Sequence, residues 1–124
     1  MKKKKKTKGK KGRKERKREL NILHFNCRGL ANEERVQEFE NALQSVKWDI
    51  IGLSEVRREG ENLIRRRNGN FFYYYGETKG YRGIGFYVKE DLGKDIIEVK
   101  GITERVGILK IKIDGELVLT VLQV

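Results

Sequence analysis

Two short apolar segments flank an amphipathic helical pattern near the start of the chain, and this order leaves few folds open. Residues 20–26 (LNILHFN) have the composition of a short buried strand, and residues 48–55 (WDIIGLSE) form an almost continuous apolar run of strand length. A helix is predicted between them over residues 33–46, with Asn32 as its N-cap and with apolar side chains at helical spacing (Val36, Phe39, Leu43 and Val46). This pattern predicts a right-handed crossover that makes the two strands parallel neighbours.

The predicted crossover places two polar side chains at the same edge of the sheet. Asn26 ends the first strand and Glu55 ends the second. Parallel strands that neighbour one another end on the same side, and α/β sheets usually bind their ligands at that side. We therefore expect Asn26 and Glu55 to lie close together and to take part in the chemistry of the protein.

The remainder of the chain is predicted to be rich in strands. Residues 56–70 are strongly charged and are interpreted as a loop or a single helical turn. Five later segments have strand composition, and Asp114-Gly115 is a two-residue hairpin signal between the last two of them: residues 71–75, 83–88, 95–102, 105–113 and 116–124. The pattern predicts an α/β fold with a mixed sheet, in which the second half of the chain is an antiparallel meander.

The positive charge of the chain is confined to its start. Residues 1–19 hold 13 Lys and Arg and 2 Glu, a difference equal to the net charge of +11, so residues 20–124 are formally neutral. Because no apolar residue lies between Lys2 and Glu19, residues 1–19 are predicted to be a disordered polybasic arm ahead of a folded body. The candidate nucleic-acid contacts in the arm are Lys2, Lys3, Lys4, Lys5, Lys6, Arg13, Arg16 and Arg18.

Several roles are open to such an arm. It can neutralise nucleic-acid phosphates, serve as a nuclear-import signal or do both, and a solvated tail without a dedicated partner is the simpler alternative. Docking to anionic lipid ranks last, because no amphipathic basic helix or lipidation motif accompanies the arm. The expected location is the nucleus.

The rest of the composition excludes several kinds of site. The single Cys27 and the single His24 exclude an internal disulfide and make a Cys- or His-based zinc site improbable, so any bound metal must use oxygen ligands. His24 is interpreted as a packed core residue, and Cys27 as a small buried or loop thiol rather than a nucleophile. No apolar run reaches the roughly 18 residues of a membrane span, and we expect a soluble intracellular protein with no membrane contact.

Four segments in this order resemble the endonuclease/exonuclease/phosphatase superfamily, and within it the apurinic-like endonucleases of non-LTR retrotransposons, also described as craniofacial development protein 2-like. They are FNCRGL at 25–30, GLSEVRR at 52–58, GYRGIGFYVK at 80–89 and ERVGILKIK at 104–112. The resemblance covers residues 20–124. It implies a partial, truncated four-layer α/β sandwich that corresponds to the N-terminal half of a family domain.

The resemblance also implies an activity, which is metal-dependent cleavage of phosphodiester bonds in DNA. Glu55 would ligate Mg²⁺, with Mn²⁺ as an alternative, and Asn26 would hydrogen-bond the scissile phosphate. Arg105 would help to organise the site. Arg28 would either touch a flanking phosphate or be a surface charge of its loop.

The last predicted strand leads to the hypothesis that the chain is a fragment. Residues 116–124 are apolar to the end, and the resemblance implies that further catalytic groups would follow, namely a Tyr, an Asp/Asn pair, another Asp and a closing Asp-His pair. The 124 residues are therefore predicted to be inactive alone. Two alternatives stay open: a domesticated or degraded fragment that binds nucleic acid non-specifically through its basic arm, and a reading-frame remnant that does not fold stably. The oligomeric state is not predicted.

Overall fold

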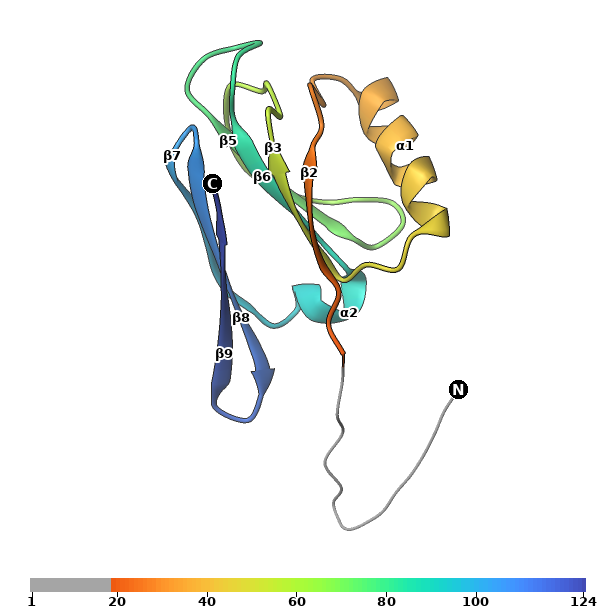
Figure 1. The fold of residues 1–124 in the computed structure, drawn as a ribbon, viewed down its shortest axis with the longest axis vertical. Coiled ribbons are helices and arrows are strands. Elements are labelled where there is room, and N and C mark those ends of the chain that lie inside the picture. The colour runs from red at the N-terminus through yellow and green to blue at the C-terminus, as the bar shows by residue number, and fades with distance from the viewer. Residues whose placement is uncertain (1–18) are drawn as a thin grey trace.

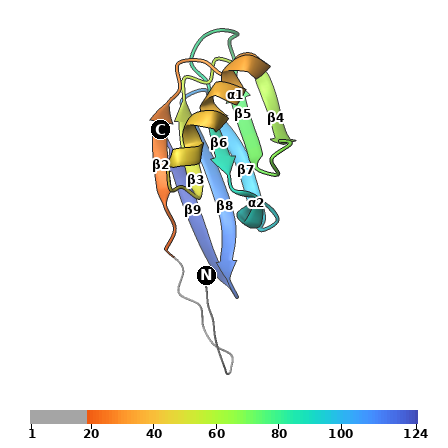
Figure 2. The ribbon, with the colours of Figure 1, turned by 90° about the vertical axis from the view of Figure 1, so that its right-hand side faces the viewer.

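The computed structural model describes residues 19–124, which form two β-sheets and one main helix (Figures 1 and 2). The elements in chain order are β2 (Ile22–Asn26), α1 (Glu33–Ala42) with a 3-10 turn (Leu43–Ser45), β3 (Ile50–Ser54), β4 (Gly60–Arg65), β5 (Phe71–Gly76), β6 (Ile84–Val88), α2 (Glu90–Gly93), β7 (Ile96–Thr103), β8 (Val106–Asp114) and β9 (Leu117–Gln123). The predicted arm, apart from Glu19, lies outside the described residues.

The larger sheet is mixed, as the sequence predicts. Its strand order is β2-β3-β6-β5-β4, with β2 parallel to β3 and every other pair antiparallel. The parallel pair follows from the crossover through α1, which covers one face of this sheet, while the smaller sheet β7-β8-β9 covers the other (Figures 1 and 2). The described part is therefore an α/β fold of three layers.

Helix α1 begins where its cap was predicted. The side chain of Asn32 accepts a hydrogen bond from Arg35 N at 2.9 Å, and Glu33 and Glu34 lie in the first turn, near the positive end of the helix dipole. The α-helix ends at Ala42 rather than at residue 46, because the last turn tightens into a 3-10 turn and Val46 is extended.

The core lies on both faces of the larger sheet. One cluster fills the space between the sheet and α1, and includes Val36, Trp48 and Tyr87. The second fills the space between the two sheets, and includes Phe86 and Leu109. Strands β3 and β6 are covered on both faces, which explains why their sequences are nearly continuous apolar runs.

The smaller sheet is an antiparallel meander covered on one side. The predicted hairpin at Asp114-Gly115 is confirmed: it joins β8 to β9, and Gly115 has a φ of +49°. Large apolar side chains on β7 and β9 stay exposed, among them Ile97, Leu117 and Leu122. No helix in residues 19–124 is long and apolar enough to cross a membrane.

Two further expectations from the sequence were wrong, and one element was missed. Residues 60–65 form strand β4 rather than a loop; this is an edge strand whose exposed, charged side chains hide its strand character. The short helix α2 was not expected. His24 is exposed rather than packed in the core: Leu23 points to the core beside α1, so the next side chain of the edge strand points to the opposite face, where Nδ1 lies 3.0 Å from Oε1 of Gln123.

Candidate functional site

The ends of β2 and β3 bring the two predicted site residues together. Asn26 is the last residue of β2 and pairs with Ser54, and Glu55 follows directly after β3. Asn26 Nδ2 donates a hydrogen bond to Glu55 Oε2 at 2.9 Å, although 29 positions separate the two residues in the sequence. The backbone N–H of Arg28 donates to Asn26 Oδ1 at 3.2 Å, which keeps the amide group of Asn26 turned towards Glu55.

The Glu55 carboxylate is ionised and accessible. Its Oε1 atom accepts a hydrogen bond from Arg57 Nη2 at 2.8 Å, and the side chains of both residues are 40% exposed. The hydrogen bond from Asn26, followed by that from Arg57, lowers the pKa of Glu55 below its ordinary value. Each carboxylate oxygen can accept more than one hydrogen bond or metal contact, so this group can still bind a ligand.

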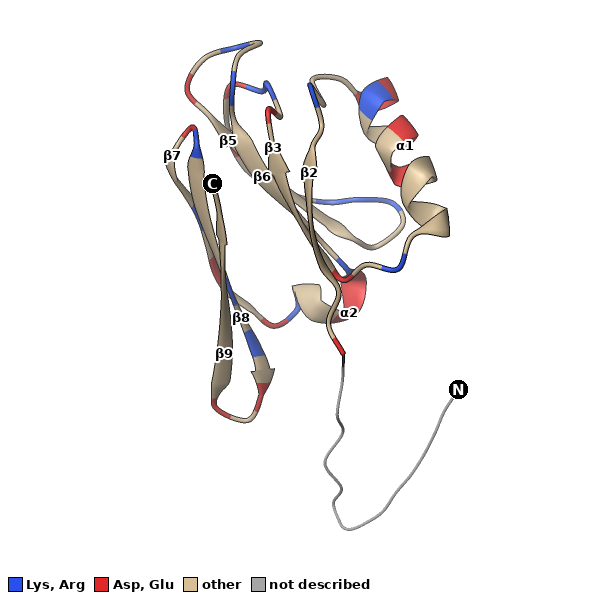
Figure 3. Cartoon of the chain, in the orientation of Figure 1, with Lys and Arg blue, Asp and Glu red and all other residues tan. Residues whose placement is uncertain are grey.

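The backbone at this edge is strained in several places. Within residues 19–124, four non-glycine residues have a left-handed backbone, and all lie in loops at the ends of these strands: Arg28 (φ 50°), Glu55 (φ 57°), Arg57 (φ 64°) and Arg82 (φ 55°). Figure 3 shows that charged residues gather in the loops here. Backbone strain of this kind persists where the surrounding structure holds it, and it concentrates at functional sites.

Hydrogen bonds between backbone groups hold these loops against one another. Gly29 N donates to Glu55 O at 2.7 Å, and Leu30 N donates to Val56 O at 2.9 Å. Val56 N in turn donates to Gly83 O at 3.1 Å, and Gly83 N donates to Glu104 O at 3.1 Å. The edge is thus a set of four loops connected by backbone hydrogen bonds.

A pocket of about 470 Å³ opens beside Glu55. Arg105, the predicted supporting residue, lines it together with Arg57 and Arg82. Arg82 Nη1 donates to Glu104 Oε2 at 3.3 Å, and its guanidinium lies 4.4 Å from the centre of the Tyr81 ring. The pocket therefore combines two glutamates with three arginines, and such arginines suit a phosphate group close to Glu55.

Sequence reasoning found some of these residues and missed others. Asn26, Glu55, Arg28 and Arg105 were named in advance, and the structure places all of them at this edge. The pairing of Arg57 with Glu55 was missed; the signal was a basic residue two positions after the candidate ligand. The arm residues proposed to contact nucleic acid lie outside the described part.

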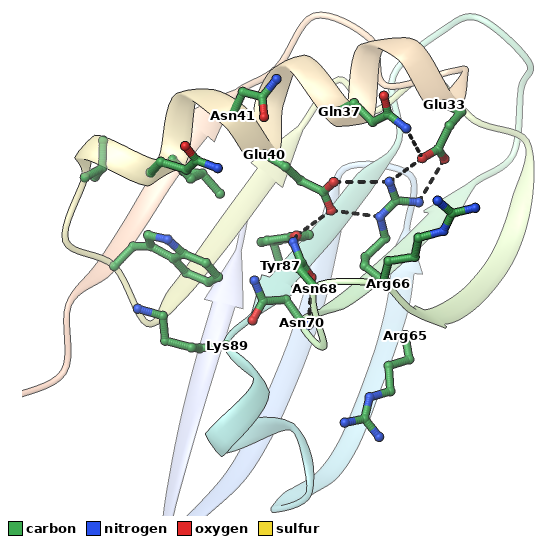
Figure 4. A pocket seen from close by; sticks show the side chains of 15 residues that line it. Glu33, Gln37, Glu40, Asn41, Arg65, Arg66, Asn68, Asn70, Tyr87 and Lys89 are labelled. Carbon is green, nitrogen blue, oxygen red and sulfur yellow. Dashed lines mark hydrogen bonds and ion pairs between the residues drawn. The ribbon is translucent and has the colours of Figure 1, made fainter.

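A second polar cluster lies away from this edge, between α1 and the turn after β4 (Figure 4). We call it the α1 network; it consists of Glu33, Glu40, Arg66 and Tyr87. Arg66 lies 2.6 Å from Glu33 Oε2 and 2.8 Å from Glu40 Oε2, and the Tyr87 hydroxyl donates to Glu40 Oε2 at 2.6 Å. The α1 network lines a pocket of about 780 Å³, but its polar groups bind one another. We therefore interpret the network as a structural clamp, that is, a set of contacts that holds α1 against the sheet.

The residues at the strand ends fit a hard divalent cation. Glu55 offers an ionised, accessible carboxylate beside a neutral carboxamide, and a cation such as Mg²⁺ uses oxygen ligands while keeping several of its waters. In residues 19–124 there is no cluster of three or more His, Cys, Asp or Glu side chains that could hold a metal. Glu55 could therefore supply one contact of a cation otherwise bound by water and substrate.

Comparison with known proteins identifies the class. Residues 20–122 match the Endonuclease/Exonuclease/phosphatase family, and the chain belongs to that family. It is similar to the DNA-(apurinic or apyrimidinic site) endonuclease 2 of Schizosaccharomyces pombe, with 25% identity over 104 residues, which cover 75% of this chain and 19% of that protein. The chain thus spans about a fifth of the length of this curated relative.

Proposed function

We propose that this chain supplies part of a metal-dependent endonuclease site that hydrolyses phosphodiester bonds in DNA. The observation that carries the proposal is the 2.9 Å contact between Asn26 and Glu55 at the ends of two parallel strands. The family to which the chain belongs, and the name of the yeast relative, support a nuclease that acts on DNA.

Each residue has a role that follows from its chemistry. Glu55 would hold the cation, Mg²⁺ or Mn²⁺, through its ionised carboxylate. The bound cation would stabilise negative charge that develops on the phosphate oxygens. Asn26 orients the Glu55 carboxylate and can hydrogen-bond a phosphate oxygen without repelling it, because a carboxamide carries no charge. Arg105, on the wall of the pocket, would bind a neighbouring phosphate, and Arg28 would extend the basic surface.

We further propose that the chain derives from an apurinic-like endonuclease of a non-LTR retrotransposon and that residues 1–124 are inactive alone. The segments FNCRGL at 25–30 and GLSEVRR at 52–58 support this origin. Among residues 19–124, no His or Asp lines the pocket beside Glu55, and the other glutamate on its wall, Glu104, is paired with Arg82. General-base catalysis contributes about 10²- to 10⁴-fold to rate, so the missing groups would have to come from outside the described residues.

Metal binding and DNA nicking by the whole chain test the proposal. Free Mn²⁺ is measured by electron paramagnetic resonance for the wild type, Glu55→Gln and the control Glu98→Gln, whose side chain is 39% exposed and pairs with Lys100 and Lys110. We expect binding that is lost only in Glu55→Gln, and no Mg²⁺-dependent nicking of supercoiled plasmid. Equal Mn²⁺ binding in all three proteins would remove Glu55 as the ligand. Nicking that depends on Glu55 would contradict inactivity but support the chemistry.

A second candidate function is non-specific binding of nucleic acid through the arm, with nuclear import as a further use of the same residues. It is favoured by the location of the whole net charge of +11 within residues 1–19. Binding by such a segment releases counterions and weakens steeply with salt. Deletion of residues 2–18 is expected to weaken duplex binding and to flatten its salt dependence. Unchanged affinity after the deletion would refute this role.

A further inference from the structure

Two adjacent arginines, Arg57 and Arg58, lie shortly after Glu55 in the sequence, and their side chains make different contacts. Arg58 is held firmly: its Nε donates to Leu30 O at 2.7 Å, and its guanidinium lies 5.3 Å from the ring centre of Phe72 and 5.0 Å from that of Tyr74. Within residues 19–124, the Arg57 side chain makes a single hydrogen bond, to Glu55, and it is 40% exposed. The Arg58 side chain is therefore packed into the fold, whereas the Arg57 side chain is held mainly by Glu55, the proposed metal ligand.

The contact between Arg57 and Glu55 is made at a carboxylate oxygen that a bound cation would also use. Arg57 Nη2 lies 2.8 Å from Glu55 Oε1, and the other carboxylate oxygen, Oε2, accepts from Asn26. A divalent cation bound to Oε1 would place its charge beside the guanidinium and repel it. Binding of the cation and the present position of Arg57 therefore oppose each other.

Arg57 also has space to move. It lines the 470 Å³ pocket beside Glu55 and a second pocket of about 410 Å³, which is also lined by Lys79 and Tyr74. Ion pairs at exposed positions contribute little to stability, so the guanidinium can leave Glu55 at small cost. Once free, it presents a planar fork of donors, and such a fork binds phosphate oxygens in pairs.

We propose that Arg57 competes with the metal for Glu55, and that metal binding releases its guanidinium to bind a phosphate of the nucleic acid. Arg57 would thus hold the Glu55 carboxylate in place before the metal binds, and would position the substrate afterwards. The inference rests on the proposed function, because it requires Glu55 to be a metal ligand.

Mn²⁺ binding to the full chain tests the competition. The variants are Arg57→Ala and the matched control Arg82→Ala, which removes the same charge from the same pocket but from a residue paired with Glu104. Removal of a competing exposed ion pair should tighten Mn²⁺ binding by about 2- to 5-fold in Arg57→Ala relative to Arg82→Ala. Weaker or equal binding in Arg57→Ala, with binding still lost in Glu55→Gln, would overturn the inference and leave the proposed function intact.

Duplex DNA binding tests the release of the guanidinium. Loss of one phosphate contact lowers the slope of log Kd against log salt by about 1. We expect this change for Arg57→Ala when Mn²⁺ is present and no change when it is absent. The same change in both conditions would mean that Arg57 binds phosphate without any metal-driven release, and would overturn the inference. If Mn²⁺ binding does not depend on Glu55 at all, the proposed function fails and the inference fails with it.

Discussion

The site at the strand ends and the α1 network are both built from arginine and carboxylate, yet they differ in burial. Arg57 and Glu55 are each 40% exposed, whereas Arg66 and Glu40 are 12% and 15% exposed. Arg57 and Glu55 also have left-handed backbones, while Glu40 lies in the regular helix α1. The comparison teaches that an arginine–glutamate pair contributes to the fold where it is largely buried, whereas a pair of the same kind stays available to a ligand where water reaches it.

The largest effect is expected from breaking the α1 network. Arg66→Ala removes the partner of Glu33 and Glu40 and leaves the nearly buried Glu40 carboxylate without its cation. Loss of one partner of such a pair costs about 3 kcal/mol of unfolding free energy. Urea unfolding measures the change, and Arg67→Ala, an exposed neighbour, is the control. Equal stability of the two variants would show that the network does not clamp α1 to the sheet.

A smaller loss is expected when one hydrogen bond of the network is removed. Tyr87→Phe keeps the buried ring but deletes the hydroxyl that donates to Glu40 at 2.6 Å and accepts from Asn68 at 3.0 Å. A hydrogen bond to a charged group contributes about 1.5–3 kcal/mol, so the unfolding free energy should fall by about 2 kcal/mol. Tyr75→Phe, which removes a hydroxyl bonded to exposed Glu77, is the control and should lose much less.

The network should also respond to acid. Hydrogen bonds from Arg66, and then from Gln37, lower the pKa of Glu33 from 4.5 to about 2. A carboxyl whose pKa is lower in the folded state stabilises the fold above its unfolded pKa, and this contribution is lost as pH falls through the folded value. The stability difference between the wild type and Glu33→Gln should therefore be constant above about pH 5 and shrink between pH 4.5 and 2.

Urea unfolding across this range measures the acid response. Glu34→Gln is the control, since Glu34 lies in the same first turn and is exposed like Glu33, but does not pair with Arg66. A difference for Glu33→Gln that does not change with pH would contradict the assigned pairing with Arg66.

The smallest effect on stability is expected at the strand ends. Glu55→Gln keeps an oxygen that can accept from Asn26 or Arg57, and the side chain is accessible to water. Surface substitutions of this kind change the unfolding free energy by less than about 0.5 kcal/mol. The same variant should lose Mn²⁺ binding. Glu55 would then affect ligand binding with little effect on stability, whereas the α1 network affects stability. A stability loss as large as that of Arg66→Ala would mean that Glu55 is a structural residue.

Much of the fold followed from local patterns. The spacing of apolar residues in α1 and the apolar run of β3 predicted the crossover, and the crossover predicted that Asn26 and Glu55 meet. The same patterns failed at β4, where exposed charges conceal an edge strand, and at His24, where the open side of β2 leaves the residue exposed. Periodicity reports which side chains are buried, so it is least informative at sheet edges.

The sequence by itself determined the order of elements, the parallel strand pair and the two polar residues at its end, because each depends on spacing along the chain. Only the tertiary structure decided which of the adjacent arginines contacts Glu55: Arg58 lies over two aromatic rings, and Arg57 reaches Glu55. It likewise decided that Arg66, rather than Arg65 or Arg67, joins Glu40. The sequence does not distinguish one neighbouring arginine from the next. They come to differ through the groups that pack around each guanidinium and through its exposure to water.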